Sequence, residues 1–571
     1  MWKYCAGKLD PFLFQQCRFY SRRKKQLIPT RKAQQLHAQP TEKGQLDKPK
    51  LFAFGNFSAL EVPKKKQIEL LQTAIENIAS FDSLRIFPTV RAAMIKEIKN
   101  GYNLKNTYVK SIDDVVIRPS PVQIAAIRKI NQPRKVAAKH LEKAGTHLLA
   151  EVMEENEKRR LKIFTIAAET GSGKSWAYLA SVLSMLKQDD MALFNRSPDA
   201  LKEAQRHSLI RAVILLPTHE LVNQVYDTVQ FAATIPLHPQ TDLTENVLKS
   251  PEFANFFLDA ANASSLDLKV FKWGVGDTPN KLFNEVKSKR IDILVTTPGK
   301  IQGLARLDNF DRPFKHFNFV DYCVVDEADT LVHESWFEDT AMTLQRFGKL
   351  KDLILCSATT PKEFEKAIQK LFTTRDSLIR IVTPQIHKIP KQIVVKVIDA
   401  EQSPFHGSKS RCLAQAIYAI HNDGTESGFV KRIIVFLNEK KHVEPLVETL
   451  ITKFHHNEED VVGVSGSDDH RDRAEKIVPF INSAEPLLEG VSSKVKVLVT
   501  TDLLARGLNF QGIKNVILMD IPKTSIDLIH RIGRTGRMRQ SGRVFVIIDR
   551  KSKKSWIKGL PRAIKAGATL G

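Results

Sequence analysis

Short runs of apolar residues recur along the chain, and each is followed by a polar turn and a stretch with helical periodicity. Runs that are apolar on both faces are typical of strands buried in a parallel sheet, because helices cover both sides of such a sheet. The alternation therefore predicts an α/β fold, with its functional loops at the carboxyl ends of the strands. The runs that predict strands are Ala212–Leu216, Ile291–Val295, Tyr322–Val325, Leu353–Cys356, Ile433–Phe436, Val495–Val499, Val516–Met519 and Val544–Ile548.

The apolar runs form two groups along the chain. The first group ends near Arg380-Ile381-Val382, residues 383–390 interrupt the rhythm as a linker does, and the second group begins near Val394. No repeat of short period is present. We therefore expect two sheet-containing domains, at residues 67–385 and 386–571. Segments 188–208, 238–268 and 482–493 are interpreted as insertions whose role the sequence does not reveal.

The first 66 residues have a different composition, and we expect a disordered basic segment there. Between Met1 and Pro40 the only acidic residue is Asp10, while basic and aromatic residues alternate. An arginine-rich, acid-poor start is typical of a mitochondrial transit peptide. Residues 18–21, Arg-Phe-Tyr-Ser, resemble a matrix-protease cleavage site, so we expect a matrix protein that begins near Ser21. A basic nucleic-acid-binding arm, or a nuclear signal at residues 22–25, is the alternative.

The charge balance points to a polyanionic partner. The chain has 87 Lys and Arg against 63 Asp and Glu, a formal net charge of +24. Such an excess is typical of proteins that bind nucleic acid or an anionic membrane, although an unusually basic soluble enzyme is also consistent with it. No apolar run reaches the roughly 18–20 residues that cross a bilayer, so we expect no membrane insertion. The five cysteines show no CxxC spacing and predict no zinc site; Cys323 and Cys356 lie in apolar runs and are expected to be reduced core thiols.

A glycine-rich segment between an apolar strand and a helix predicts a phosphate site. Gly171 and Gly173 allow the backbone N–H groups to surround phosphate oxygens, and the following helix adds its positive N-terminus. Lys174 can neutralise phosphate charge, and the Ser175 hydroxyl can ligate Mg²⁺. Ala168 stands where the general pattern has its first glycine, and a chance glycine-rich turn is the alternative. The candidate nucleotide-binding loop comprises Ala168, Glu169, Thr170, Gly171, Ser172, Gly173, Lys174 and Ser175.

A pair of acids follows another apolar strand. An acid at a strand end beside a phosphate loop can hold Mg²⁺, in part through water, and an adjacent acid can orient or deprotonate the attacking water. Asp326 suits the first role and Glu327 the second. Paired acids after a strand are also common as helix caps, so this segment gains weight only beside the phosphate loop.

Three arginines surround two glycines in the second half, within His530–Arg537. We interpret this pattern as incompatible with a packed core. It predicts either a phosphate-binding surface or arginine fingers that reach a nucleotide held by the first half.

Taken together, these segments resemble the DEAD-box family of superfamily 2 RNA helicases, in the family's order, over residues of about 81 to 550. Any one short motif is weak evidence, whereas ten in order make coincidence implausible. The segments that carry the resemblance, besides the loop and the acid pair, are residues 119–123 (the Q motif), 217–221 (PTHEL), 297–300 (TPGK), 357–359 (SAT), 434–436, 470–473, 501–507 and 530–537.

The resemblance implies two RecA-like domains that close on ATP, Mg²⁺ and single-stranded RNA. It implies that Gln123 contacts adenine, that Asn509 lies near the ribose, and that Arg534 and Arg537 act as arginine fingers. Lys174, Asp326 and Glu327 would complete the catalytic set. The family grips the RNA backbone and disrupts a few base pairs without translocating, which carries little sequence information. The positions implied to contact RNA are Pro217, Thr218, His219, Thr297, Pro298, Gly299, Lys300, Arg473 and Thr501.

Several positions depart from the family pattern. His219 and Lys300 stand where the family has arginine, which predicts weaker or rearranged RNA contacts. His470 replaces a glutamine, Val116 an aromatic residue that stacks on adenine, and Asn509 an aspartate. With the N-terminal segment, these departures resemble the fungal mitochondrial DEAD-box proteins that serve assembly of the large ribosomal subunit.

Two hypotheses of different classes follow. The first is an RNA-dependent ATPase that remodels mitochondrial large-subunit rRNA within ribosomal assembly intermediates, acting as a monomer. The second is an ATP-gated RNA clamp or scaffold in which slow hydrolysis only times release. RNA-stimulated turnover distinguishes them. A DNA helicase is a third possibility, which stimulation by DNA without RNA would favour.

Overall fold

The computed structural model describes residues 78–100, 111, 115–134, 160–243, 247, 249–307, 312–360, 362–371, 378–383, 387–482, 484–488, 490–491, 493–502, 510, 512–536, 541–552 and 555–567. The predicted transit segment, its cleavage site, Asn509 and Arg537 lie outside these ranges, as does the predicted domain boundary at residues 385 and 386. Those predictions stay predictions.

A seven-stranded sheet, in which every pair of neighbours is parallel, organises the first half of the chain. Its strand order is β3-β4-β2-β5-β6-β1-β7. The strands are β1 (Lys162–Ala167), β2 (Ile210–Leu215), β3 (Val270–Trp273), β4 (Ile291–Thr296), β5 (Tyr322–Val325), β6 (Asp352–Ser357) and β7 (Leu378–Val382).

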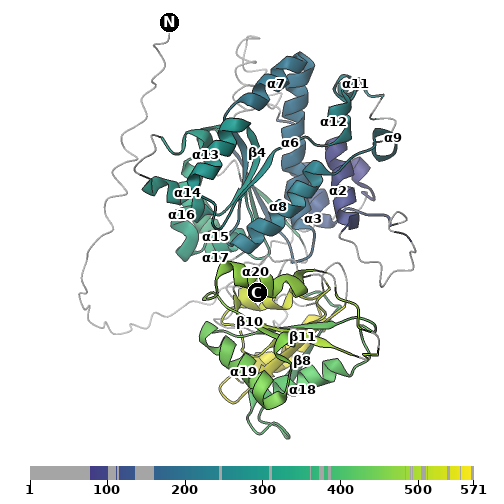
Figure 1. Ribbon diagram of the computed structural model, residues 1–571, viewed down its shortest axis with the longest axis vertical. Coiled ribbons are helices and arrows are strands. Elements are labelled where there is room, and N and C mark those ends of the chain that lie inside the picture. Colours follow the sequence, from purple (N-terminus) through teal and green to yellow (C-terminus); the bar gives the residue numbers. More distant parts are fainter. Residues whose placement is uncertain are drawn as a thin grey trace, which may run out of the picture. The chain divides into compact units, whose positions relative to one another are not determined.

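Helices flank this sheet, as Figure 1 shows for α6, α8 and α13. The described helices of the first half are α2 (Pro88–Asn100), α3 (Pro121–Ile130), α6 (Lys174–Arg196), α7 (Pro198–Arg206), α8 (His219–Thr234), α9 (Pro239–Asp242), α11 (Pro251–Phe257), α12 (Ala260–Ser264), α13 (Pro279–Ser288), α14 (Pro298–Gly303), α15 (Ala328–Leu331), α16 (Glu334–Gln345) and α17 (Lys362–Leu371).

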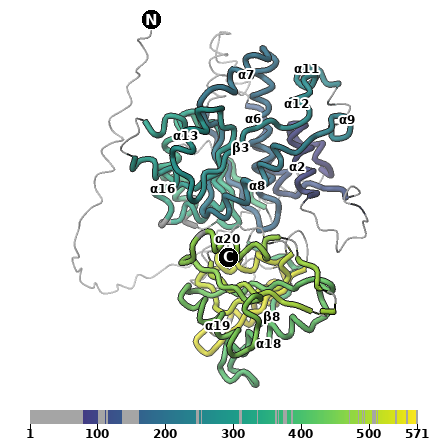
Figure 2. The backbone as a smooth tube through the Cα atoms, viewed as in Figure 1, coloured from purple at the N-terminus to yellow at the C-terminus, as the bar shows by residue number. Residues whose placement is uncertain are grey.

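A second parallel sheet of six strands follows, in the order β10-β11-β9-β12-β13-β8. Figure 2 traces this part of the backbone in green to yellow. Its strands are β8 (Ile393–Asp399), β9 (Lys431–Phe436), β10 (Val461–Val464), β11 (Val495–Thr500), β12 (Asn515–Leu518) and β13 (Gly542–Ile548). Its helices are α18 (Lys409–His421), α19 (Val443–Phe454), α20 (His470–Ile481), α21 (Ser525–Ile532) and α22 (Ser555–Lys565).

The register of the first sheet places three loops side by side. Ala167 at the end of β1 pairs with Ser357 at the end of β6, and Val325 at the end of β5 pairs with Leu355. Because the carboxyl ends of parallel strands meet at one edge, the phosphate loop, the acid pair and the segment after Ser357 lie together. The order and register of the strands therefore bring the predicted site residues together.

The predicted α/β class with two tandem parallel-sheet domains is confirmed. All eight predicted strands are present, with ends that differ by at most two residues. Two edge strands, β3 and β10, were not predicted. Lys272 interrupts the apolar run of β3, whose two central residues are only half-buried, and Gly463 interrupts that of β10.

The insertions near 188–208 and 238–268 are largely helical where they are described. Phe253, Phe256 and Phe257 of α11 form edge-on ring contacts with Phe87 or Phe194, and Phe253 stacks on Phe257, so this insertion extends the core of the first half. The thiols of Cys323 and Cys356 are buried in the core, as expected. Among the described helices, none combines the length and apolar character that spanning a bilayer needs.

Candidate functional site

The phosphate loop wraps around its own lysine. Gly171 and Gly173 have φ angles of 76° and 88°, which a side chain would strain, so glycine is needed at both positions. Lys174 opens α6, and its Nζ donates to the carbonyls of Ala168 and Glu169, each at 2.9 Å. Ser172 Oγ donates to the Glu169 carbonyl at 2.7 Å. The ammonium group is thereby held at the N-terminus of α6, where a phosphate could replace these carbonyls.

Gln123 joins the Q-motif helix to this loop. Ser120 and Gln123 form a capping box at the start of α3, in which Gln123 Oε1 accepts from the Ser120 amide at 2.9 Å. Its Nε2 donates to the Gly173 carbonyl at 3.2 Å. A Cβ on Gly173 would lie 2.7 Å from this nitrogen, which is a second reason for glycine there. Val116, by contrast, is exposed.

The acid pair lies beside the loop with two different environments. Asp326 Oδ2 accepts from Tyr178 Oη at 2.9 Å, and its Oδ1 accepts from the Glu327 amide at 2.9 Å. Burial, followed by the neighbouring charge of Glu327, raises the pKa of Asp326 to about 6. Glu327 is buried in a left-handed backbone conformation, with φ at 49°. That strain is typical of functional positions.

These residues fit a magnesium ion. Among the described residues, Glu327 Oε2 is buried without a hydrogen-bond partner, which is costly unless water or an ion completes it. Carboxylate and hydroxyl oxygens are the ligands that Mg²⁺ prefers, and Asp326 and Ser175 offer them. A bound magnesium ion would supply charge neutralisation for the phosphates of ATP.

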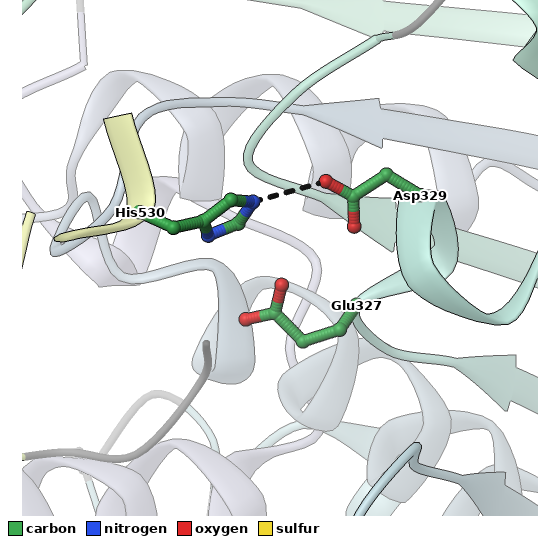
Figure 3. Close-up of side chains that lie close together, drawn as sticks. All are labelled: Glu327, Asp329 and His530. Atoms are coloured by element: carbon green, nitrogen blue, oxygen red, sulfur yellow. Dashed lines mark hydrogen bonds and ion pairs between the residues drawn. The ribbon is translucent and has the colours of Figure 1, made fainter. Parts of the chain in front are cut away.

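A third carboxylate of this segment, that of Asp329, reaches a residue of the second half. Asp329 Oδ2 accepts from Thr359 Oγ1 and lies 3.1 Å from His530 Nε2, as Figure 3 shows for the histidine. Glu327, Asp329 and His530 each bring one polar atom within 4.8 Å of the others. All three side chains are buried. The acid segment after β5 is therefore in direct contact with α21.

The arginines of the second half correct one prediction. Arg531 and Arg534 are 0% and 1% exposed, so the interpretation that these arginines cannot lie in a core is wrong. Arg531 is buried because its donors are satisfied: it donates to both Asp502 oxygens at 2.6 and 2.8 Å and to Asn438 Oδ1 at 2.8 Å. Arg534 Nε donates to the His530 carbonyl at 3.2 Å. The finger role of Arg534 stays a prediction.

Two further contacts join the halves. A Cβ added to Gly533 would lie 2.2 Å from Thr170 Oγ1 of the phosphate loop. Arg473 of α20 forms an ion pair with Glu220 of α8, with Nε and Oε1 3.1 Å apart and both side chains buried. The segment after α21 and the α20 face therefore approach the first half at separate points.

The predicted RNA-contact residues occupy helix starts. Thr218 and Thr297 accept from the amides of Leu221 and Lys300 and cap α8 and α14. Lys300 Nζ donates to the Asp277 carbonyl at 2.8 Å. Burial lowers the pKa of Lys300, and the charge of Asp277 opposes that shift. Of the other predicted positions, Pro217, Pro298 and Thr501 are buried, His219 is half-buried and Gly299 is exposed.

Sequence reasoning missed the roles of several residues. Tyr178 lies in a helix that reads as core, and its hydroxyl could not be assigned to Asp326 without the fold. Thr383 lies at the start of the linker and donates through Oγ1 to Glu169 Oε2 at 2.9 Å. A buried linker histidine, His387, was likewise assigned no role. The only signal for Thr383 and His387 was their place in the linker, which does not specify contacts.

Two family models match the chain. Residues 120–367 match the model described as DEAD/DEAH box helicase, and residues 408–539 match the helicase conserved C-terminal domain. Together they include the phosphate loop, the acid pair, Asp329 and His530.

Close relatives match over nearly the whole chain. The protein called ATP-dependent RNA helicase MRH4, mitochondrial, from Debaryomyces hansenii is 60% identical over 532 residues, covering 92% of this chain and 89% of its own length. The protein of the same name from Saccharomyces cerevisiae is 39% identical, with 91% and 87% covered.

Solved helicase structures share the fold. A structure of Mss116p bound to single-stranded RNA and AMP-PNP aligns with a TM-score of 0.57 at 18% identity, covering 87% of this chain and 79% of that one. Dbp5 of S. cerevisiae, bound to RNA and ADP BeF3, aligns with a TM-score of 0.53 at 18% identity, with 86% and 94% covered. At this identity the likeness is one of fold.

Proposed function

Because this chain belongs to the DEAD-box family of ATP-dependent RNA helicases, we propose that it remodels mitochondrial large-subunit rRNA during ribosome assembly, with one ATP hydrolysed per closure of its two halves. The chain is an RNA-dependent ATPase, and its localisation is mitochondrial, as in relatives that match nearly its full length. The rRNA target is the part that goes beyond the family.

One observation supports coupling between ATP hydrolysis and the contact of the two halves. Asp329, from the acid segment, lies 3.1 Å from His530 of the second half, in a buried cluster with Glu327. A buried carboxylate is costly unless it is hydrogen-bonded, so the second half contributes directly to ordering the hydrolytic segment. ATP hydrolysis therefore depends on how the halves meet, and RNA that contacts both halves favours that state.

Each residue of the site has a proposed task. Lys174 neutralises phosphate charge, Asp326 holds Mg²⁺ in part through water, and Glu327 orients the attacking water. Arg534 and Arg537 stabilise the charge that develops on the transferred phosphate. Gln123 connects adenine recognition to the loop, because its amide already contacts the Gly173 carbonyl.

The rRNA proposal rests on charge and on relatives. The net charge of +24 suits a ligand rich in phosphate, and contacts to an RNA backbone carry little sequence information. Target choice must then come from location and from the parts of the chain outside the two family models. Crosslinking in intact mitochondria, followed by sequencing of the bound RNA, tests this. Enrichment of large-subunit rRNA supports the proposal, and enrichment of mRNA alone contradicts it.

A second candidate is the ATP-gated clamp with slow hydrolysis. It is favoured by the way two predicted RNA contacts are engaged within the protein: Lys300 donates to the Asp277 carbonyl, and Arg473 pairs with Glu220. Purified protein distinguishes the two candidates. The remodelling enzyme turns over ATP repeatedly when RNA is added, whereas the clamp hydrolyses ATP slowly even with RNA and stays bound until that hydrolysis releases it.

A further inference from the structure

The linker between the two sheets reaches the ATP site through a histidine. His387 lies between β7 and β8, is only 2% exposed, and has a left-handed backbone with φ at 61°. Its Nε2 lies 3.1 Å from the Thr360 amide nitrogen and 3.3 Å from Thr360 Oγ1. Non-glycine residues adopt this conformation rarely and at a cost, so the surrounding contacts hold it in place.

The partner of His387 determines its protonation state. A backbone N–H can only donate, so Nε2 must accept through its lone pair and the ring proton must lie on Nδ1. A doubly protonated ring would place two donors against each other. In agreement, burial lowers the pKa of His387 to about 4, although Asp329 raises it. The side chain is therefore a neutral acceptor at physiological pH.

Thr360 directly follows Thr359, which holds Asp329, the carboxylate that contacts the second half. The Thr359 amide donates to Ser357 Oγ at 3.1 Å, and Thr359 Oγ1 donates to Asp329 Oδ2. Asp329 in turn meets His530. A continuous series of contacts thus runs from His387 through Thr360, Thr359 and Asp329 to the second half.

Thr383 provides a parallel contact from the start of the same linker. Its amide donates to the Ala167 carbonyl at 3.0 Å, and its Oγ1 donates to Glu169 Oε2 in the phosphate loop. The linker therefore touches both the phosphate loop and the loop after β6, rather than serving only as a covalent tether.

We propose that His387 is a positioning residue for ATP hydrolysis. Its imidazole accepts a hydrogen bond from the Thr360 amide and so fixes the loop after β6. Through Thr359, this loop holds Asp329 in the position where it contacts His530. The inference rests on the proposed function, because it assigns a part of the linker to the hydrolytic step. His387 touches neither substrate nor the reacting atoms in this role.

Two variants separate the hydrogen bond from the space that the ring fills. In His387→Gln, the Oε1 atom stands as many bonds from Cβ as Nε2 does and can accept from the Thr360 amide. His387→Leu offers similar bulk without an acceptor. Neither residue is branched at Cβ, so both bear about the same backbone cost at this φ.

The first readout is independent of activity. Hydrogen–deuterium exchange of the Thr360 amide is measured in the full-length protein without nucleotide. We expect exchange about tenfold faster in His387→Leu and within about threefold of wild type in His387→Gln, because only the latter retains the acceptor.

The second readout is steady-state ATP hydrolysis with saturating single-stranded RNA. We expect kcat to fall about tenfold in His387→Leu with the KM for ATP nearly unchanged, and to recover in His387→Gln. Unchanged amide exchange in His387→Leu, or faster exchange with unchanged kcat, would overturn the inference. A wild-type protein without RNA-stimulated hydrolysis would instead overturn the proposed function, and the role of His387 in hydrolysis with it.

Discussion

Gly533 of the second half lies against Thr170 of the phosphate loop so closely that a Cβ would come within 2.2 Å of the threonine hydroxyl. The φ angle of Gly533 is −67°, which any residue adopts, so the glycine is needed for proximity and not for conformation. The two halves can approach this closely only because position 533 has no Cβ.

Gly533→Ala is predicted to hinder closure while leaving both sheets folded. The added methyl group must displace Thr170 or separate the halves, so RNA-stimulated kcat should fall by about tenfold or more, with ATP affinity little changed. Gly303→Ala is the matched control, because a Cβ there meets nothing within 4 Å. Equal turnover in both variants would mean that the halves do not approach in this way during hydrolysis.

The ion pair between Glu220 and Arg473 supports a charge-exchange test. Both side chains are buried, so Glu220→Arg or Arg473→Glu alone leaves like charges facing each other and should cut RNA-stimulated turnover about tenfold or more. The double exchange restores opposite charges and should recover part of the loss. Additive losses in the double variant would show that the two residues are not coupled.

Tyr178→Phe removes one hydroxyl from a buried helix and leaves its shape intact. The hydroxyl donates to Asp326 and lowers the pKa of that carboxyl, which burial has raised to about 6. Without the hydroxyl this pKa should rise further. Protons and Mg²⁺ compete for Asp326, so the acid limb of the ATPase pH profile at limiting Mg²⁺ should move to higher pH. An unshifted profile would exclude Tyr178 from this role.

His387 makes a prediction for stability against pH. Its pKa falls from an ordinary value near 6.5 to about 4 in the folded protein, so between these values the unfolded chain binds more protons. Its contribution is therefore present above pH 6.5 and is lost as the pH falls toward 4. From pH 7 to pH 5, wild type should lose about 2 kcal/mol more unfolding free energy than His387→Gln. Unfolding free energies are measured by urea titration at both pH values. An equal loss in wild type and in His387→Gln would contradict the assignment.

The strands that the sequence predicted are those with continuous apolar runs, and the hydrophobic effect alone places them at the centre of a sheet. Edge strands β3 and β10 escaped prediction because Lys272 interrupts the apolar run of β3 and Gly463 that of β10. The phosphate loop and the acid pair were also predictable. Glycine, lysine and carboxylate residues that follow a strand can be recognised as candidate ligands for phosphate or metal without knowledge of the tertiary structure.

Contacts between distant segments were not predictable. Arg531 looks like a surface residue from sequence because isolated guanidinium groups are not buried, and only the fold brings Asp502 and Asn438 to satisfy it. The same holds for His387, whose acceptor role depends on the Thr360 amide in another element. Sequence patterns report which side chains can do chemistry, whereas pairing across the two sheets depends on the tertiary structure.

We propose that this buried site hydrolyses ATP in response to RNA, with Glu327 orienting the water. The most direct test compares wild type with Glu327→Gln, which keeps the size and removes the charge. RNA-stimulated ATP turnover and ATP affinity should be measured on the same full-length preparations. We predict stimulation by RNA in wild type, and in the variant a turnover reduced by about 100-fold or more with ATP affinity within about threefold. Wild-type turnover in Glu327→Gln would contradict the account.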